Sequence, residues 1–486
     1  MDLSLHFEIE KLSEKEVKEL AKKAAEYAYA KGIIMKSRKL PDLVEHAPFV
    51  LYPTPFPRRL FDQAKEVQRD FNVLVHKVSL DHDFLKESLQ GTVTVDKFTG
   101  RIYDIYEQTR KEGIAQPISL GLLRSDYMLD CENPNDLNKK SSFENMKIKQ
   151  VEINTIASSF GCLGSKLPDL GSYVLGLHGL NCPVGSPQIP QNTALEGLGE
   201  GLAQAWEFYG SQSAVVLMVK SEDESNTFDQ KNLEYYLHHR NPSIKMIFHS
   251  LTVLSKIASL DNKTLMVGGE EVAVAYFRSG YTPSCYPSED EWSARLLIER
   301  SLAIKCPSAA MHLVGTKKVQ QVLAEPGVLE RFITDEGALK RIRSTFTGLY
   351  TLDEGPEGEQ TVKMALQDPE KFVLKPQREG GGNNIFGDDI KTTLNQMKTP
   401  VDRSQFILMD RIRSPLVKNY IIRPELDKPL LADVLSEFGT FGILISLGKR
   451  ILVSKEVGHL MRTKSVEHQD GGVASGRANL DSPYLV

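Results

Sequence analysis

The sequence predicts a mixed α/β protein with more than one packed unit, and three observations lead to this prediction. A chain of 486 residues is too long for one simple hydrophobic core. Apolar runs such as residues 214–219 alternate with helical patterns in the middle of the chain, which is typical of buried parallel strands. Further along, residues 441–447 and 451–453 alternate about Gly448, which predicts an antiparallel hairpin.

The composition is that of an ordinary globular protein, with 41% hydrophobic and 25% charged residues. The net charge of −5 gives no reason to expect nucleic-acid or membrane binding, so an anion site must be a local cluster of basic residues. No signal peptide and no apolar run near the roughly 18 residues of a membrane helix is visible. The five cysteines lack a C-x-x-C pair, which favours reduced thiols in the cytoplasm.

The first third of the chain is predicted to be mainly helical. A helix over residues 13–31 begins at a capping box formed by Ser13 and Glu16, and Gly32 ends it. Helical spacing of apolar residues returns in two later segments, residues 59–89 and 96–112.

Two predicted strands follow, and both carry polar residues. Residues 118–123 form the first strand and deliver Arg124 at its end, whereas residues 148–154 form the second. On the second strand, Glu152 and Asn154 are two residues apart and therefore point to the same side. Their oxygens suit Mg²⁺, which binds few protein oxygens beside phosphate and water. A half-exposed polar strand face is the alternative.

The middle of the chain predicts a compact parallel α/β unit. Apolar runs at residues 214–219, 246–248 and 272–277 are separated by a helix, and another helix begins near Glu291. In such units the ligand-binding groups lie at the carboxyl ends of the strands. Arg278 directly follows the third run, so we expect it to contact a ligand.

The segment from Phe372 to Asn384 predicts an anion-binding loop. A short strand runs into Lys375, Arg378 and Glu379, and the three glycines 380–382 follow. Consecutive glycines are costly to order, and they are used where backbone amides must approach phosphate oxygens. The basic residues can neutralise phosphate, and Glu379 offers an oxygen to Mg²⁺. A flexible surface loop is the alternative.

Other basic residues lie where they can join this loop. Lys317 and Lys318 open a helical segment, and because adjacent helical residues diverge by about a quarter turn, only one can point into a site. Arg462 and Lys464 come shortly before a second Gly-rich segment, residues 470–476.

Common nucleotide-binding and hydrolase motifs are absent. There is no G-x-x-x-x-G-K-[ST] and no G-x-S-x-G. Gly197, Gly199 and Gly201 resemble a dinucleotide fingerprint, but no convincing strand precedes them, so they predict the start of a helix.

Several segments, taken together, resemble eukaryotic-type glutathione synthetase, and they occur in order along nearly the whole chain. They are Arg124–Tyr127, Glu152–Ile156, Tyr276–Tyr281, Gly315–Gln321, Leu374–Asn384, His459–Lys464 and Asp470–Val473. The resemblance implies a permuted ATP-grasp fold with an inserted parallel α/β unit and Gly-rich lid loops. It assigns residues 1–213 and 316–486 to the ATP-grasp core and residues 214–315 to a substrate-binding domain.

The resemblance also assigns roles to individual residues. It implies Glu152, Asn154 and Glu379 as Mg²⁺ ligands and Arg462, Lys375 and Lys317 as the catalytic residues. Residues that would contact ATP are Glu152, Lys317, Lys375, Pro376, Gln377, Arg378, Glu379, Gly380, Gly381, Gly382, Asn383, Asn384, Phe386, Met409, Asp410, Arg411, Ile412, Glu437, Lys464 and Asp470. Residues that would contact the other substrates are Arg124, Ile156, Ala157, Ser158, Ser159, Glu224, Ser225, Asn226, Gln230, Arg278, Tyr281, Arg462, Val473 and Ala474. Ala157 stands where the family often has a serine.

The implied activity is an ATP-dependent ligase, a homodimer in the cytoplasm, that makes glutathione from γ-L-glutamyl-L-cysteine and glycine through an acyl phosphate. This is the second step of glutathione biosynthesis. Two alternatives stay open at this point. One is the same ligase with another acceptor, such as β-alanine, although the small residues Val473, Ala474 and Ser475 favour glycine. The other is an inactive nucleotide-binding regulator, against which the full set of expected ligands and lysines argues.

Overall fold

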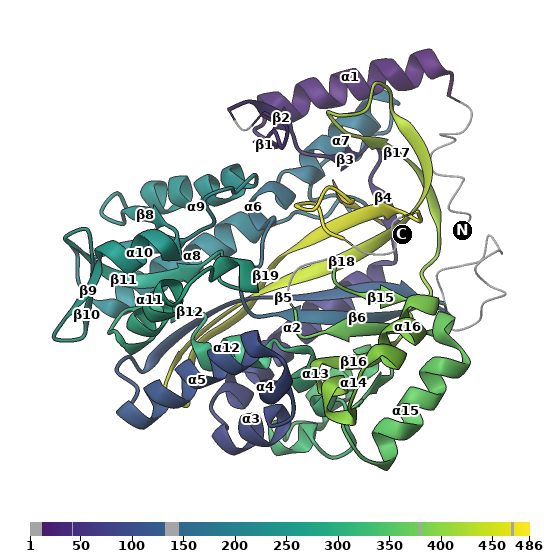
Figure 1. Cartoon of the computed structure of the whole chain (residues 1–486). Coiled ribbons are helices and arrows are strands. Elements are labelled where there is room, and N and C mark those ends of the chain that lie inside the picture. Colours follow the sequence, from purple (N-terminus) through teal and green to yellow (C-terminus); the bar gives the residue numbers. More distant parts are fainter. Residues whose placement is uncertain (1–11, 41, 132–144, 379–381, 468–470) are drawn as a thin grey trace.

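The computed structural model describes residues 12–40, 42–131, 145–378, 382–467 and 471–486. A long seven-stranded sheet crosses the molecule, a six-stranded sheet lies at one end of it, and a four-stranded sheet lies at the other (Figure 1). Of the predicted site residues, Glu379, Gly380, Gly381 and Asp470 lie outside the described residues.

The central sheet has the order β17-β3-β20-β19-β18-β5-β6, and its neighbours are antiparallel except for β20 and β3. Its strands are β3 (Phe49–Val50), β5 (Ile118–Asp130), β6 (Lys147–Asn154), β17 (Val417–Ile422), β18 (Leu430–Leu447), β19 (Arg450–Ser465) and β20 (Ala478–Asp481).

The predicted hairpin about Gly448 is confirmed, but it is much longer than expected. Its strands β18 and β19 extend far beyond residues 441–453, because both faces of the sheet are covered and the simple alternation is lost. Strand β5 is longer for the same reason, since nearly every residue from Leu120 to Tyr127 is buried. The expectation that Arg124 ends a strand is therefore wrong; it lies within β5.

Helices from the first third and from residues 309–345 cover one face of this sheet. On that face Phe438 contacts the rings of Phe56 and Phe61, and Thr440 Oγ1 donates to Gln68 Oε1 at 2.9 Å. The helices are α2 (Arg58–Ser79), α3 (His82–Leu89), α4 (Thr92–Val95), α5 (Lys97–Glu112), α12 (Ala309–Val314), α13 (Lys317–Leu323) and α14 (Glu336–Thr345).

The predicted parallel α/β unit is present. Strand β7 pairs in parallel with β8 and β11, β11 pairs in parallel with β12, and β9 and β10 add an antiparallel edge. The strands are β7 (Val215–Val219), β8 (Met246–His249), β9 (Ala258–Asp261), β10 (Thr264–Val267), β11 (Glu270–Phe277) and β12 (Ile304–Cys306). The helices near them are α8 (Ala194–Tyr209), α9 (Thr227–Arg240), α10 (Leu251–Ile257) and α11 (Glu289–Arg300).

The glycines at 197–201 lie in helix α8, as the sequence predicts, rather than in a phosphate loop. A Cβ at Gly197 would overlap Val457, and one at Gly199 would overlap Tyr236. These glycines therefore allow close packing of the helix on its neighbours.

The four-stranded sheet has its own small core and is antiparallel throughout. It contains β13 (Leu349–Tyr350), β14 (Phe372–Pro376), β15 (Ile385–Phe386) and β16 (Phe406–Asp410), with helices α15 (Pro356–Gln367) and α16 (Asp388–Gln396) packed beside it (Figure 1). Short 3-10 helices at Leu329–Arg331, Pro369–Lys371 and Pro400–Gln405 connect its neighbourhood.

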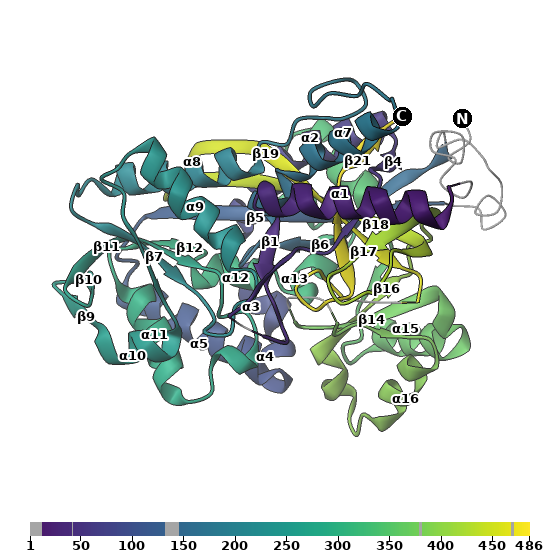
Figure 2. The same ribbon diagram turned by 90° about the horizontal axis from the view of Figure 1, so that it is seen from above.

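The N-terminal segment lies across the top of the central sheet (Figure 2). Helix α1 (Glu14–Ala30) has the predicted capping box of Ser13 and Glu16. The remaining elements are β1 (Ile34–Lys36), β2 (Val44–His46), β4 (Thr54–Phe56), α6 (Gly161–Gly164), α7 (Leu167–Leu177), a 3-10 turn (Pro283–Cys285) and β21 (Pro483–Leu485), which pairs with β4. None of the helices in the described ranges combines the length and hydrophobicity that a membrane span requires.

Candidate active site

The register of the central sheet gathers polar side chains onto the face opposite α2. Asp126 on β5 pairs with Glu152 on β6 and with Gly439 on β18. Arg462 on β19 pairs with Glu437, two residues before Gly439. Because residues two apart on a strand point to the same side, this face also carries three more of the predicted site residues, Arg124, Asn154 and Lys464. Residues from four strands thus meet in one cluster.

Glu152 lies beside two lysines. Its Oε2 is 3.0 Å from Lys317 Nζ, and Lys375 Nζ donates to the carbonyl of Val151 at 2.7 Å. Burial alone raises the pKa of Glu152, but the charges of Lys317, Lys375 and Arg462 lower it to about 2. The Glu152 carboxylate is therefore ionised at neutral pH. Both lysines lie at the same part of β6, since one contacts Glu152 and the other contacts Val151.

Asp126 joins three of the neighbouring groups. Arg124 binds it in a bidentate manner, with Nε to Oδ1 at 2.6 Å and Nη2 to Oδ2 at 2.8 Å. Arg462 Nη2 and Asn154 Nδ2 donate to Oδ2 at 3.0 and 2.9 Å. Arg462 also donates to Glu437; burial lowers the pKa of Arg462, but the charges of these carboxylates raise it above its usual value.

Glu437 closes the cluster on β18. Burial raises its pKa above the usual range, while Arg462 and Lys464 oppose this shift. The resemblance implies that Glu437 and Lys464 contact ATP. In the structure Glu437 lies close enough to Arg462, Glu152 and Lys464 for their charges to act on its pKa.

The loop after β6 is held in an unusual backbone conformation. Ala157 and Phe160 have φ angles of +53° and +65°, which non-glycine residues rarely adopt. Arg278 Nη1 donates to the Ala157 carbonyl at 2.7 Å, and Arg124 Nη1 donates to the Ser159 carbonyl at 3.1 Å. Such strain is common at binding sites, where neighbouring groups hold it in place. The two arginines predicted to bind substrate therefore also shape residues 156–159.

The buried carboxylate of Asp229 accepts hydrogen bonds from the end of the same loop and from the helix that follows it. Asp229 accepts from the backbone amides of Phe160, Cys162 and Leu163 at 2.9–3.0 Å, and it lies 3.8 Å from Arg278. Burial raises the pKa of Asp229, while Arg278 and the three amides oppose this rise.

The segment from Glu224 to Gln230 lies at the start of α9. Glu224 accepts from the Asn226 amide at 2.8 Å and from Gln230 Nε2 at 2.9 Å. The side chain of Asn226 is buried, and neither of its polar atoms has a hydrogen-bond partner in the described part of the chain. Since such groups are costly to bury unsatisfied, Asn226 is suited to a bound ligand. The backbone carbonyl of Ser225 accepts from the Lys36 amide at 2.9 Å. Tyr281 is partly buried and packs against the hydrophobic core.

The second glycine loop lies over Arg462. A Cβ at Gly472 would be 3.9 Å from Arg462 Nη1. Arg38 donates to the carbonyls of Val473, at 3.0 Å, and Ala474. Arg38 thus attaches this loop to the N-terminal segment, while the Val473 side chain is buried in the hydrophobic core and Ala474 is exposed.

The segment 409–412, which the resemblance assigns to ATP and places against the adenine base, begins in β16 and continues beyond it. Met409 lines a narrow cavity between the central and four-stranded sheets, together with Lys317, Lys375 and Val151. Its volume is about 10 Å³, enough for one water molecule, so a base enters only if the sheets separate.

Two other residues of this segment, Asp410 and Arg411, contact side chains outside it. Tyr350 donates to Asp410 Oδ1 at 3.2 Å. Arg411 pairs with Glu370 at 2.9 Å and lies over the ring of Phe386. Ile412 follows β16 and is half-buried.

The first glycine loop begins where β14 ends at Pro376. Gln377 Oε1 accepts from the Lys318 amide at 3.0 Å, and Arg378 donates to Asp96 rather than pointing freely into solvent. Beyond the undescribed glycines, Gly382 has a φ of +100°, and Asn383 and Asn384 lead into β15.

Glu152 and Asn154 are the described residues that fit a metal ion. Asn154 Nδ2 faces two acceptors, Asp126 Oδ2 and the Arg124 carbonyl, so its Oδ1 must face the other way. Outside the undescribed segments, no group of three or more His, Cys, Asp or Glu side chains is placed to hold a metal. An ionised carboxylate and an amide oxygen are nonetheless suitable ligands for Mg²⁺ in the presence of phosphate.

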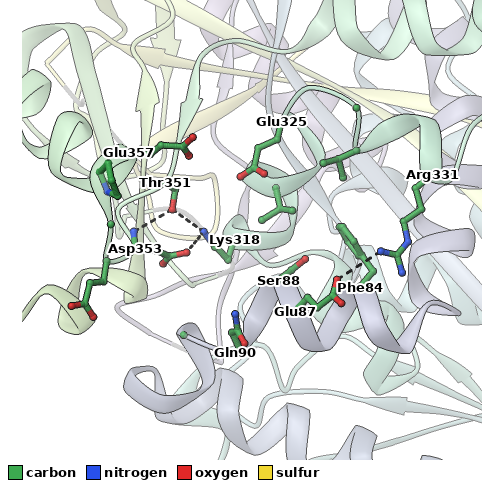
Figure 3. A pocket seen from close by; sticks show the side chains of 18 residues that line it. Phe84, Glu87, Ser88, Gln90, Lys318, Glu325, Arg331, Thr351, Asp353 and Glu357 are labelled. Carbon is green, nitrogen blue, oxygen red and sulfur yellow. Dashed lines mark hydrogen bonds and ion pairs between the residues drawn. The ribbon is translucent and has the colours of Figure 1, made fainter.

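Lys318 faces a different part of the molecule. It lies in the wall of a pocket of about 780 Å³ that contains none of the predicted site residues (Figure 3). There its Nζ lies 2.5 Å from Asp353 and donates to Gln321 and Thr351. The expectation that only one of the two lysines points into the site is confirmed.

Asp126, Asp229 and Arg38 are not among the site residues predicted from the sequence. Strand alternation could have found Asp126, which is two residues from Arg124 and so on its face. Asp229 and Arg38 act on backbone groups distant in sequence, and no local pattern marks them.

Comparisons with known proteins identify the family of this chain. A family model described as the ATP-binding domain of eukaryotic glutathione synthase matches residues 14–485. The chain belongs to this family. Glutathione synthetase of Rattus norvegicus is 46% identical over 478 residues, covering 97% of this chain and 98% of that protein. For glutathione synthetase of Dictyostelium discoideum the identity is 41% over 490 residues, covering 97% and 100%.

A solved structure of a similar protein has the same fold. The glutathione synthetase-like effector of Globodera pallida, in its apo form, superposes with a TM-score of 0.77 at 25% identity and covers 98% of each chain. The predicted mixed α/β fold of the ATP-grasp family is thereby confirmed.

Proposed function

We propose that this chain is an ATP-dependent ligase that joins γ-L-glutamyl-L-cysteine to glycine, with glutathione, ADP and phosphate as products. One observation carries the proposal: in a chain of the glutathione synthase family, one sheet face gathers Lys317, Lys375 and Arg462 around the ionised Glu152. Such a concentration of positive charge suits a reaction that handles a triphosphate and two carboxylates.

The first step activates a carboxylate. The cysteinyl carboxylate oxygen attacks the γ-phosphorus of ATP, the bond to ADP breaks, and an acyl phosphate forms. This transfer needs charge neutralisation and in-line placement rather than a protein nucleophile. Lys317 and Lys375 would neutralise the phosphates, because both residues line the same cavity as Met409.

The second step forms the peptide bond. The glycine amine attacks the acyl carbon, loses a proton, and phosphate leaves. Arg462 Nη1 faces the second glycine loop and is placed to stabilise the negative oxygen of the tetrahedral intermediate. Arg124 and Arg278 hold residues 156–159, against which the dipeptide lies, and Val473 and Ala474 contact glycine.

Mg²⁺ is the proposed cofactor, held by Glu152, Asn154 and Glu379. When bound it supplies positive charge between the phosphate groups of ATP. The orientation of Asn154 Oδ1 supports this assignment.

The two Gly-rich loops are proposed to act as lids. An acyl phosphate must be shielded from water, or ATP is hydrolysed without product. The volume of the cavity beside Met409 supports an opening motion, since a base cannot enter it as it stands.

A turnover assay tests the proposal. Phosphate release is measured with ATP, Mg²⁺, γ-glutamylcysteine and glycine, and omission of each substrate serves as the control. Release that requires all three is expected. A folded protein with no release would contradict the ligase function and favour the inactive regulator, which the comparisons do not support.

A panel of acceptors tests the choice of glycine. Alanine, serine and β-alanine replace glycine at equal concentration, and a preference for glycine is expected because Val473 and Ala474 leave little room. Faster turnover with β-alanine would favour the alternative acceptor.

A homodimer in the cytoplasm and the division into residues 1–213 with 316–486 and residues 214–315 complete the proposal. Exposed apolar residues near α1, including Leu43, Val44 and Leu430, support a subunit interface there. Light scattering measures the mass, and a monomer at micromolar concentration would exclude the dimer.

A further inference from the structure

The Asp126 carboxylate is the most connected group of the cluster. It is fully buried, and both of its oxygens accept hydrogen bonds from Arg124, while Oδ2 also accepts from Arg462 and Asn154. A carboxylate can accept about four such bonds, so its capacity is nearly filled by these protein groups. Asp126 has little capacity left for a ligand of its own.

Strand β18, which pairs with β5 beside Asp126, leaves space for the Asp126 side chain. Gly439 lies directly opposite on β18, and a Cβ there would overlap Asp126 Oδ1 and come within 2.9 Å of Arg124 Cδ. Gly439 does not have a positive φ angle, so its backbone conformation does not require glycine. The requirement is space for the carboxylate and the guanidinium.

The bonds to Asp126 determine which atoms its partners present to the site. Arg462 uses Nη2 for Asp126 and Glu437, which leaves Nη1 toward Gly472. Asn154 uses Nδ2, which leaves Oδ1. Arg124 uses Nε and Nη2, which leaves Nη1 for the carbonyl of Ser159.

We propose that Asp126 is a positioning residue of the ligase reaction, which aligns Arg462 and Arg124 through one shared carboxylate. The proposal rests on the proposed function. Asp126 does not touch ATP or the reacting carboxyl group; it fixes the two guanidinium groups that do touch the substrates. On the nucleotide side, Lys317 pairs with Glu152, and Lys375 donates to the carbonyl of Val151.

The first experiment is Asp126→Asn, which keeps the shape and removes the charge. The kcat is expected to fall roughly 10- to 100-fold, as for other residues that orient an active group. The KM for γ-glutamylcysteine is expected to rise because Arg124 loses its alignment, whereas the KM for ATP is expected to rise less, because Asp126 reaches the nucleotide side only through Asn154. A general loss of structure would raise both KM values together, and that result, like unchanged kinetics, would overturn the proposal.

A double-mutant cycle separates positioning from an independent effect. Arg462→Lys is measured alone and combined with Asp126→Asn. Because Asp126 acts through Arg462, the combined loss of kcat is expected to be well below the product of the two single losses. Multiplicative losses would overturn the proposal. Wild-type enzyme is assayed in parallel, so that absence of wild-type turnover reports on the proposed function and not on Asp126.

A second variant covers the case that Asp126→Asn does not fold. Gly439→Ala leaves every charge in place but displaces the carboxylate. It is expected to lower kcat with an unchanged KM for ATP, checked against a melting temperature near that of wild type. Normal kcat in folded Gly439→Ala would overturn the proposal.

Discussion

Lys317 and Lys318 are adjacent and identical in type, yet they serve two different regions. Lys317 pairs with Glu152 at the cationic face of the central sheet. Lys318 pairs with Asp353 in the wall of the 780 Å³ pocket and bonds Gln321 and Thr351 (Figure 3). Both lysines are buried to a similar degree, with 4% of each exposed. Burial and charge therefore do not separate a ligand-binding lysine from a structural one; the partners do.

The difference lies in the charges around each ammonium group. Lys318 lies beside Asp353 and donates to the neutral oxygens of Gln321 and Thr351. Lys317 pairs with Glu152 but shares that carboxylate with the charges of Lys375 and Arg462, and like charges kept so close are costly unless an anion joins them. A triphosphate is such an anion.

The largest expected effect is on activity. Lys317→Met removes the charge but keeps the length, and kcat/KM is expected to fall roughly 10²- to 10⁴-fold, as when other charge-stabilising groups are removed. Lys318→Met is the matched control and should stay within a few-fold of wild type. Equal losses in the two variants would erase the distinction between the regions. Lys375→Ala, on the same face as Lys317, should lose activity by a similar factor.

A smaller effect is expected from Glu152→Gln. The variant keeps a hydrogen-bonding oxygen but loses the charge that offsets Lys317, Lys375 and Arg462. Turnover is expected to fall about 10- to 100-fold, and a higher Mg²⁺ concentration should restore part of it. Measuring turnover against Mg²⁺ concentration checks this. If the Mg²⁺ dependence of turnover is unchanged in Glu152→Gln, Glu152 is not a metal ligand. Asp353→Asn is the control, because it removes a carboxylate charge outside the site.

The Lys318 region should instead show an effect on stability. Lys318→Met leaves Asp353 without its ammonium partner, and because that carboxylate is partly exposed to solvent, the expected loss is about 1 kcal/mol. Urea unfolding measures it. A loss of activity without any loss of stability would assign Lys318 to the chemistry.

The smallest expected effect is the pH dependence of the stability loss in Lys318→Met. Burial raises the pKa of Asp353, but Lys318 lowers it overall below its usual 3.8, so this pair stabilises the fold above about pH 4 and less as the pH falls further. In Lys318→Met the charge of Lys318 is absent, so the pKa of Asp353 is higher than in wild type, although the hydrogen bonds from Ser404 and Thr351 still lower it. The difference in unfolding free energy between wild type and Lys318→Met should therefore narrow from pH 7 to pH 3.5. A constant difference would show that Asp353 does not titrate in this range.

Much of this arrangement could be predicted from sequence, because it follows from local patterns. The capping box of α1, the divergence of Lys317 and Lys318, and the shared side of Glu152 and Asn154 each depend on residues within one element. The resemblance to eukaryotic-type glutathione synthetase supplied the fold. The length of β18 and β19 could not be predicted, since burial on both faces removes the alternation that marks a strand. Asp229 and Arg38 were missed because they bind backbone groups far away in sequence.

The strand order of the central sheet joins residues that are far apart in the sequence. Strand β3 lies between β17 and β20, and β4 pairs with β21, so the partners of these two short strands all come from much later in the sequence. Contacts between residues so distant in sequence form slowly, because the entropy of closing the long intervening loop must be overcome first. The pairing of β3 and β4 with their partners is therefore expected to form late in folding, after local elements such as the capped helix α1.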